Sequence, residues 1–547
     1  MKTAFRNHIN NIILPSVAFS AVTGAVTGGL IFAFRVISEQ VIHVSREIYA
    51  LAHVKPQFIP LLVLGALTLA LLVSFTLLYS PHSRGGGIPT AVALMRGLIT
   101  FHWLRDFIFV FTSALISYLG GSPLGNDEGP AVQIGTAVGS GTSHLFARKH
   151  PAWERYLMTG GATAGFAAAT GAPISAVLFG LEEAHRRFSP LLLMSSITSV
   201  LCGMGVLEVL CTLTGKSSAL FHFHITAILP LKLLWLALPV GLLCGVFAYL
   251  FAKLTLVLRT VLHKHCKTWH PFFKVAPVFL LVVLVGCVSY NAIGTGHDLI
   301  EELLERRVLW YVALALLLVR SVLVILSNDV GATGGLFTPL LVFGALIGSV
   351  FGEAMIALGV LELKYFMLMV VMGMAAFFAG SVRTPLTAIV FSVEVLSGFG
   401  NILPILLSIL MSFVIVETIG VTSINEIAME REIHKEHKGK KRQVVDTEVE
   451  VKPGAFAIGK EPRDILWPPF CRVMFVRRGE KAKDAYEGGV IREGDILRLN
   501  FTTFDAEHTA AELRAIVGEQ DVFENAEIRE GERLAELNTR TVRRKRL

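Results

Sequence analysis

The stretch PLGNDEGPAVQIGTAVGS, Pro123–Ser140, places two adjacent carboxylates, Asp127 and Glu128, at the start of an almost uncharged run. It lies in a chain of 547 residues that is 53% hydrophobic and only 17% charged. Apolar runs long enough to cross a bilayer recur along the chain, for example Phe58–Tyr79 and Trp310–Ser327. The sequence therefore predicts a polytopic membrane protein, in which acids inside an apolar segment need a physical reason.

The flanking segments indicate how the chain is oriented. The first apolar run, Ile12–Phe34, is too long for a signal-peptide core and lacks an Ala-x-Ala cleavage site, so we expect a membrane helix there. The formal net charge is +7, and basic residues gather at His434–Arg442 and Arg543–Arg546. Because such residues mark cytoplasmic segments, we expect a cytoplasmic C-terminus in a bacterial inner (plasma) membrane. Nucleic-acid binding is an alternative interpretation of these runs that we do not favour.

The composition changes near Met429, from apolar before it to charged after it. In the second part, Arg472–Val476 and Asp495–Asn500 predict strands, and Ala506–Val517 predicts a helix. We expect four units: a membrane domain at 1–429, a charged linker at 430–446, a small α/β cytoplasmic domain at 447–518 and a charged tail at 519–547.

Two pairs of matching blocks indicate an internal repeat. APISAVLFGLE ends at Glu182, and TPLTAIVFSVE ends at Glu394, 212 positions later. GPAVQIGTAVGS ends at Ser140, and TPLLVFGALIGS ends at Ser349, 209 positions later. Small residues alone could reflect helix packing, but two blocks in the same order predict repeats, at about 10–215 and 225–425. Inverted repeats around a midplane site are the usual transporter arrangement.

Three segments share a glycine-rich turn, a proline and a short apolar helix: Arg84–Leu94, Gly125–Gly135 and Gly331–Gly344. Glycine permits the turn, and proline suits the first helical turn. Each predicted helix start carries unpaired N–H groups and about half a unit of positive charge. Three such ends aimed at one point would bind an anion and still release it. The alternative is ordinary helix starts at the membrane surface, with Glu128 as a first-turn acid.

These segments resemble the signature motifs of the CLC family of chloride channels and proton-coupled anion exchangers. Gly85–Pro89 resembles Gly-Ser-Gly-Ile-Pro, the stretch ending Glu128–Pro130 resembles Gly-Lys/Arg-Glu-Gly-Pro, and Gly335–Pro339 matches Gly-x-Phe-x-Pro. The resemblance covers about residues 10–430. It implies an all-α membrane domain of about 17–18 helices per subunit in inverted repeats, and a homodimer with an anion pathway in each subunit.

The resemblance also implies roles for individual residues. Glu128, with Gly129, would form the gated external anion site. Backbone N–H groups would contact anions deeper in the pathway: those of Leu336 and Phe337 the central anion, and those of Gly85 and Gly86 the anion nearer the cytoplasm.

Glu183, the second acid of FGLEEAHRRF, matches the inner proton-transfer glutamate of the family's exchangers. The alternative is an ion pair with Arg186 or Arg187, three or four residues on. Known channel members usually have a neutral residue at this position.

The chain departs from the family pattern at three places. Gly86 stands where the family has a serine, and Asn425 where it has a tyrosine, and both lost residues offer hydroxyl groups to the central anion. Asp127 stands where the family has Lys or Arg. With backbone amides and Asn425 as the remaining anion-binding groups, we expect a weaker or less chloride-selective central site.

The C-terminal part resembles a TrkA-C domain, a regulatory module attached to many ion transporters. The shared features are Gly459, the strand running into Arg477–Gly479, and the turn Glu493–Asp495 before the last strand. The resemblance implies dimerisation and a small-molecule ligand that the sequence does not identify.

We therefore expect transmembrane transport of chloride or another small anion, coupled to protons through a protonatable glutamate. A passive voltage- or pH-gated anion channel is the alternative, because the missing serine and tyrosine favour looser coupling. A cation transporter regulated by a TrkA-C domain is a remote alternative, since the sequence has no Thr-Val-Gly-Tyr-Gly-like filter. The sequence also has no metal-binding cluster, nucleophile elbow or nucleotide loop, so we expect no enzymatic activity and no cofactor.

Overall fold

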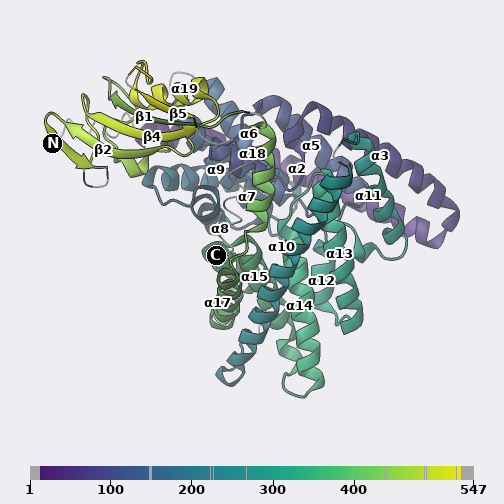
Figure 1. The fold of residues 1–547 in the computed structure, drawn as a ribbon. Coiled ribbons are helices and arrows are strands. Elements are labelled where there is room, and N and C mark those ends of the chain that lie inside the picture. The colour runs from purple at the N-terminus through teal and green to yellow at the C-terminus, as the bar shows by residue number, and fades with distance from the viewer. Residues whose placement is uncertain are drawn as a thin grey trace.

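The computed structural model describes residues 13–530, except 147–150, 222, 224, 226, 267, 398, 438, 439, 486, 488 and 525. The start of the first expected repeat and the basic segment Arg543–Arg546 lie outside the described residues. Figure 1 shows a large body of helices with a small strand-containing unit at one side, formed by the end of the chain.

The described part of the membrane domain holds seventeen α-helices, within the expected range. Eight helical segments among these described residues are long and apolar enough to cross a bilayer. The first half contains α2 (Leu14–Val54), α3 (Ile59–Tyr79), α4 (Ile88–Met95), α5 (Trp103–Leu119), α6 (Glu128–Phe146), α7 (Glu154–Thr170), α8 (Pro173–Phe179) and α9 (Pro190–Thr214). The second half contains α10 (Ala237–Cys266), α11 (Pro271–Gly286), α12 (His297–Glu305), α13 (Trp310–Val330), α14 (Phe337–Ala357), α15 (Phe366–Val382), α16 (Pro385–Phe391), α17 (Ile402–Ile419) and α18 (Ile424–Glu436).

The repeat predicted from the two block pairs is present in the helices. Helix α14 begins 209 positions after α6, and α15 and α16 begin and end 212 positions after α7 and α8. Helices α8 and α16 each continue into a π-helical segment, Gly180–His185 and Ser392–Ser397. The small residues of the blocks serve close packing as well: a Cβ at Gly135 would lie 2.0 Å from Gly161 O, and one at Gly344 would lie 2.2 Å from Gly373 O.

The two repeats run in opposite directions. Helix α7 begins beside the C-terminal domain, where the rings of Trp153 and Phe456 lie 5.2 Å apart. Its counterpart α15 ends on that side, because Val382 lines a cavity together with Met429 of α18. Helices α8 and α16 also pack on each other, and each receives at its first turn a glutamate of the other repeat. Such a reciprocal contact is what a two-fold rotation produces, as expected for inverted repeats.

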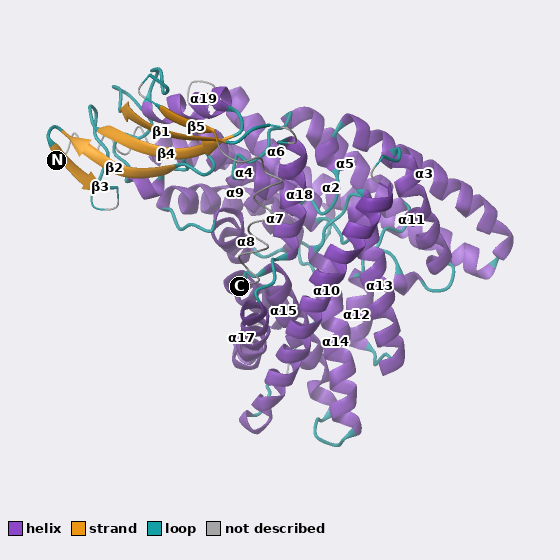
Figure 2. Cartoon of the chain, viewed as in Figure 1, coloured by secondary structure: helices purple, strands orange, loops and turns teal. Residues whose placement is uncertain are grey.

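In its described residues the C-terminal domain is an antiparallel five-stranded sheet, drawn as orange arrows in Figure 2, with one α-helix. The elements are β1 (Gln443–Glu450), β2 (Arg472–Arg478), β3 (Lys481–Asp484), β4 (Ile496–Thr503), α19 (Ala506–Val517) and β5 (Glu527–Glu530), and the strand order is β3-β2-β4-β1-β5. The two strands and the helix predicted in this part of the chain are present. Leu497, Leu499, Phe501 and Leu513 form the centre of the core and are fully buried.

The boundaries of this domain differ from those expected. Helix α18 runs through the expected boundary at 429, β1 begins within the expected linker 430–446, and β5 comes from the expected tail 519–547. Strand β1 pairs along its whole length with β4, from Gln443↔Thr503 to Glu450↔Ile496. The sequence of β1 looks like a charged linker because its polar residues alternate with the buried Val445 and Val449.

A short segment before β2 docks this domain onto the membrane domain. The Tyr156 hydroxyl donates to Asp464 O (3.0 Å) and accepts from Leu466 N (2.9 Å). The Arg155 guanidinium donates to Trp467 O (2.7 Å) and to Met95 O at the end of α4 (3.0 Å). The Arg155 side chain therefore connects the docked segment, Asp464–Trp467, to α4, the helix that follows the first glycine-rich turn.

Candidate anion and proton site

The three glycine-rich segments meet at one place, as their shared pattern predicts. Gly125 N donates to Gly335 O (2.5 Å) and Gly335 N donates to Gly125 O (3.3 Å), which joins the starts of α6 and α14. Gly334 N donates to Gly85 O (3.2 Å), which adds the turn before α4. Three helix N-termini, each with unpaired N–H groups, are thus held together inside the membrane domain.

Glycine is required where these segments touch. A Cβ at Gly129 would lie 2.3 Å from Gly86 O and 2.6 Å from Gly335 Cα, and both contacts are with backbone atoms. Gly87 has a φ of +72°, and a Cβ there would lie 2.3 Å from Gly129 O. A side chain at either position would force the segments apart, so the motif glycines permit the convergence of the three helix starts.

A cavity of about 10 Å³ lies beside this convergence, about the space of one water molecule. Five of the residues proposed from the sequence line it: Gly86, Leu336, Phe337, Asn425 and Glu183. The other described lining residues are mostly apolar: Ile88, Phe166, Phe179, Leu340, Phe378, Val382 and Thr387. None of the described lining residues is a lysine or an arginine. An anion here would be held by backbone dipoles rather than by a full charge.

Glu128 opens α6 and is fully buried. The Thr338 hydroxyl, in the first turn of α14, donates to Glu128 Oε1 (2.7 Å). The other oxygen, Oε2, has no hydrogen-bond partner among the described residues. The carboxylate thus lies between the N-termini of α6 and α14, where their dipoles favour a negative charge. Thr338 was not proposed from the sequence, because it occupies the variable position before the proline of Gly-x-Phe-x-Pro.

Glu183 lies in the π-helical segment after α8 and is buried. Its carboxylate accepts a hydrogen bond from the side-chain amide of Asn425. The alternative partners from the sequence are wrong: Arg186 pairs with Glu426 (2.6 Å), and Arg187 donates to Ile465 O (3.0 Å). The helical register that would bring them to Glu183 is lost, since the segment is π-helical and Arg186 turns left-handed at φ 50°.

Asn425 has a hydrogen-bond partner that the resemblance does not imply. The resemblance makes it an anion ligand, and it does line the cavity, but one of its amide N–H groups is committed to Glu183. A second N–H remains. Asn425 therefore joins the expected anion cavity to the expected proton-transfer glutamate.

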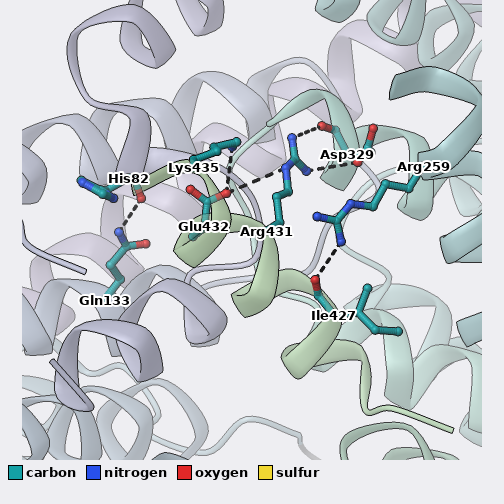
Figure 3. Close-up of polar contacts among 8 residues, drawn as sticks. All are labelled: His82, Gln133, Arg259, Asp329, Ile427, Arg431, Glu432 and Lys435. Carbon is teal, nitrogen blue, oxygen red and sulfur yellow. Dashed lines mark hydrogen bonds and ion pairs between the residues drawn. The ribbon is translucent and has the colours of Figure 1, made fainter. Parts of the chain in front are cut away.

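Helix α18, which carries Asn425, is fixed against the membrane domain (Figure 3). Arg431 binds Asp329 at the end of α13, both at the carboxylate (3.1 Å) and at the backbone carbonyl (2.7 Å). Arg259 of α10 donates to Ile427 O (2.8 Å). These contacts hold α18 in place, and so restrict where Asn425 can lie.

Comparison with solved structures identifies the fold. The chain is similar to a slow cyanobacterial Cl−/H+ antiporter, with a TM-score of 0.70 at 23% identity over 77% of this chain and 99% of that one. It is also similar to a eukaryotic CLC transporter (TM-score 0.64, 22% identity, 77% of this chain and 74% of that one) and to a CLC-type fluoride/proton antiporter (0.60, 21%, 74% and 96%). The molecule therefore has the fold of a CLC membrane protein.

Sequence comparison identifies the family of the chain. The model of the family described as voltage gated chloride channel matches residues 64–417, and the chain belongs to that family. The H(+)/Cl(-) exchange transporter ClcA of Klebsiella pneumoniae (strain 342) is 28% identical over 362 residues, which are 65% of this chain and 76% of that protein. The matched region ends before the C-terminal domain.

Proposed function

We propose that this protein exchanges chloride, or a related small anion, for protons across the membrane. The observation that carries the proposal is a pair of buried carboxylates: Glu128, which bonds Thr338 at the converging helix N-termini, and Glu183, which lines the small cavity beside them. Relatives named as chloride/proton exchangers support the same function. An acid buried in a membrane protein is costly, so two buried acids near the converging helix N-termini favour a role in transport.

The chemistry follows from where Glu128 lies. As a carboxylate it occupies the N-terminal dipoles that would otherwise attract the permeant anion. Protonation removes its charge and weakens its hold on the helix ends, so that it can leave and an anion can take its place. Glu183 then supplies or removes the proton on the inner side, away from the dipoles that repel a positive charge. We propose that the backbone N–H groups of Leu336 and Phe337 bind the central anion.

The second candidate function is a passive anion channel. It is favoured by Gly86, which offers no hydroxyl to the cavity, and by Asn425, whose amide is engaged with Glu183. An anion bound only by backbone dipoles would be held less firmly, and looser binding permits anion movement without a matching proton.

The two functions are separated by flux measurements in liposomes containing the purified full-length protein. With an outward chloride gradient and no initial pH gradient, an exchanger drives protons inward against the pH gradient that this movement creates. We expect such pumping in the wild type. Glu183→Gln should stop it and leave anion flux, and Glu128→Gln should remove both proton coupling and pH dependence.

A wild-type protein that never moves protons against their gradient would instead be a channel. A reversal potential that follows the chloride gradient alone, at every pH gradient applied, is the corresponding electrical result.

We propose further that the protein is a homodimer in a bacterial inner membrane and that it needs no cofactor. The C-terminal domain would be cytoplasmic and of TrkA-C type, with a small-molecule ligand. Cross-linking in membranes tests the dimer, and chloride flux after removal of residues 443–547 tests the regulatory role.

A further inference from the structure

The acid next to Glu128, Asp127, lies at a cavity of the membrane domain. A cavity of about 540 Å³ opens between α2, the end of α9 and the start of α12, and Asp127 is among its lining residues. Helix α6 starts beside this cavity, and Trp153, shortly after its other end, contacts Phe456 of the C-terminal domain. The cavity is therefore on the side of the membrane domain opposite the C-terminal domain. Because the basic segments predict a cytoplasmic C-terminal domain, the cavity is expected on the extracellular side.

Asp127 lies between this cavity and Glu128. Glu128 is fully buried and is not among the described residues that line the cavity, whereas Asp127 and Asn126 are. Tyr118 O–H, from α5, donates to Asn126 O (2.8 Å) and helps to hold this turn. Asp127 is next to Glu128 in the chain and lines the cavity, so its side chain offers an outward path to a proton that leaves Glu128.

The Asp127 carboxylate bonds a side chain of another helix instead of the backbone N–H groups that its position at the start of α6 would favour. Its own carbonyl accepts the first backbone bond of α6, from Ala131 N (2.8 Å), which makes Asp127 the N-cap residue. An N-cap carboxylate normally accepts a backbone N–H two or three residues on, but the third residue is Pro130, which has none. The side chain turns instead to Ser38 of α2, and Oδ1 has no hydrogen-bond partner among the described residues.

Asp127 is only 5% exposed, so this unpartnered oxygen is buried. A buried acceptor without a partner is destabilising, because it has lost its hydrogen bonds to water without gaining others. A proton on the carboxylate would remove much of that cost, because a carboxylic acid has less need of hydrogen bonds than a carboxylate.

The Ser38 hydroxyl suits both protonation states of Asp127. It lies 2.9 Å from Asp127 Oδ2 and 3.0 Å from Arg35 O. When Asp127 is ionised, the hydroxyl donates to Oδ2. When Asp127 is protonated, Oδ2–H donates to Ser38 Oγ, and the hydroxyl rotates to donate to Arg35 O. Rotation of one O–H bond therefore satisfies both states without moving the backbone.

The surrounding charges leave Asp127 without an ion-pair partner among the described residues. Arg35 of α2 donates to Ala168 O (3.1 Å) and Ser218 O (3.2 Å), and Glu39 of α2 pairs with Lys216. The other titratable groups near Asp127 or Glu128 or along the cavity belong to five elements: Glu128 itself in α6, Tyr118 in α5, His43 and Arg46 in α2, Cys211 in α9, and His297 and Asp298 in α12.

We infer that Asp127 is a third proton-binding carboxylate of the transport cycle, beside Glu128 and Glu183, and carries protons between Glu128 and the outer cavity. The inference rests on the proposed proton coupling. In the outward direction the proton leaves the Glu128 carboxyl group, binds the Asp127 carboxylate and then passes to water in the cavity. One proton enters the pair and one leaves it, and nothing else is consumed.

The test measures chloride efflux and proton uptake simultaneously in liposomes containing the full-length protein. Asp127→Asn removes the proton-binding group, and we expect proton flux to fall on the order of tenfold while chloride flux falls much less. Ser38→Ala removes the switching hydroxyl and should change the chloride-to-proton ratio in the same direction. Asp127→Glu keeps a carboxylate in a cavity with room for it, and should retain coupled proton flux.

Glu39→Gln is the matched control. Its carboxylate lines the same cavity and carries the same charge, but it is exposed and paired with Lys216. It should leave the ratio unchanged, which separates proton binding from the general charge of the cavity.

The inference is overturned if Asp127→Asn keeps the wild-type ratio, or if both fluxes fall in proportion, as they would for a purely structural residue. Wild-type protein that moves no protons would overturn the proposed function itself, and this inference with it. Coupled wild type with an unchanged ratio in Asp127→Asn would overturn the inference alone.

Discussion

Glu182, which follows α8, caps the start of α16, and Glu394, which follows α16, caps the start of α8 in the same way. Glu182 accepts hydrogen bonds from Leu386 N (3.0 Å) and Thr387 N (2.7 Å) at the start of α16. Glu394 accepts them from the equivalent atoms at the start of α8, Ile174 N and Ser175 N, each at 2.8 Å. The hydroxyl groups of Thr387 and Ser175 add a third bond in each case. Each repeat thus supplies the N-terminal cap of a helix in the other repeat.

This relationship predicts matched effects on stability. Glu182→Gln and Glu394→Gln each replace a charged acceptor of three hydrogen bonds by a neutral one, and each should destabilise the protein by about 1–2 kcal/mol. We expect a similar fall in the midpoint of thermal unfolding for both variants in detergent. The chloride-to-proton ratio should stay near the wild-type value in Glu182→Gln, because Glu182 is a helix cap. Unchanged midpoints in both variants would show that the caps contribute nothing.

The contact between Asn425 and Glu183 predicts a different pattern from the ion-pair alternative. Asn425→Leu has a similar size but leaves the buried Glu183 carboxylate without its amide donor. We expect proton flux to fall more than chloride flux in simultaneous flux measurements. Arg186→Gln is the comparison, since Arg186 pairs with Glu426 and should leave the flux ratio unchanged. If Arg186→Gln were the more damaging change, the assigned contact would be wrong.

Restoring the missing hydroxyl at Gly86 should strengthen anion binding. Gly85 and Gly87 have positive φ angles, but Gly86 does not, so its backbone accepts a side chain. A Cβ there would lie 3.2 Å from Leu336 Cγ, a contact that a small shift of the leucine relieves. One added hydrogen bond contributes on the order of 1 kcal/mol, so Gly86→Ser should tighten chloride binding several-fold in calorimetry. Gly86→Ala adds the same Cβ without the hydroxyl, and equal affinities in the two variants would place Gly86 outside the anion site.

Lys460 predicts a pH-dependent stability of the C-terminal domain. Burial lowers the pKa of Lys460 to about 7, and its ammonium group lies over the ring of Phe456, 3.6 Å from the centroid. Between that pKa and the ordinary lysine pKa, the unfolded chain binds the proton that the folded chain releases. Stability should therefore rise with pH above about 7, by about 1 kcal/mol per pH unit, and level off below it.

Hydrogen exchange of the strand amides of β1 and β4 in the full-length protein measures this dependence. Lys460→Met should remove most of it and raise protection at pH 7. Lys452→Met is the control, since Lys452 is partly exposed and pairs with Glu450. An equal pH dependence in Lys460→Met and wild type would rule out Lys460 as its source.

Local patterns in the sequence determined much of this architecture. The blocks ending at Glu182 and Glu394 predicted the repeats, because their apolar and small residues pack in the same way in each half. The glycine-rich turns predicted helix starts, because glycine adopts positive φ angles without steric cost and has no Cβ to block the close backbone contacts that these turns need. The helix at Ala506–Val517 is amphipathic, and its bounds follow from that local periodicity. Strand β1 was missed, because its alternation of valine with charged residues looks like a polar linker until β4 is beside it.

Only the tertiary structure decided which side chains meet. Thr338 binds Glu128 across 210 positions, Asn425 binds Glu183 across 242, and Ser38 binds Asp127 across 89. Each of these bonds joins helices that the sequence predicts separately, and its formation depends on how those helices pack and rotate against one another. Helical periodicity reports which face of one helix is apolar. It does not report which residue of another helix lies opposite a buried carboxylate, since that is decided by the packing of the whole membrane domain.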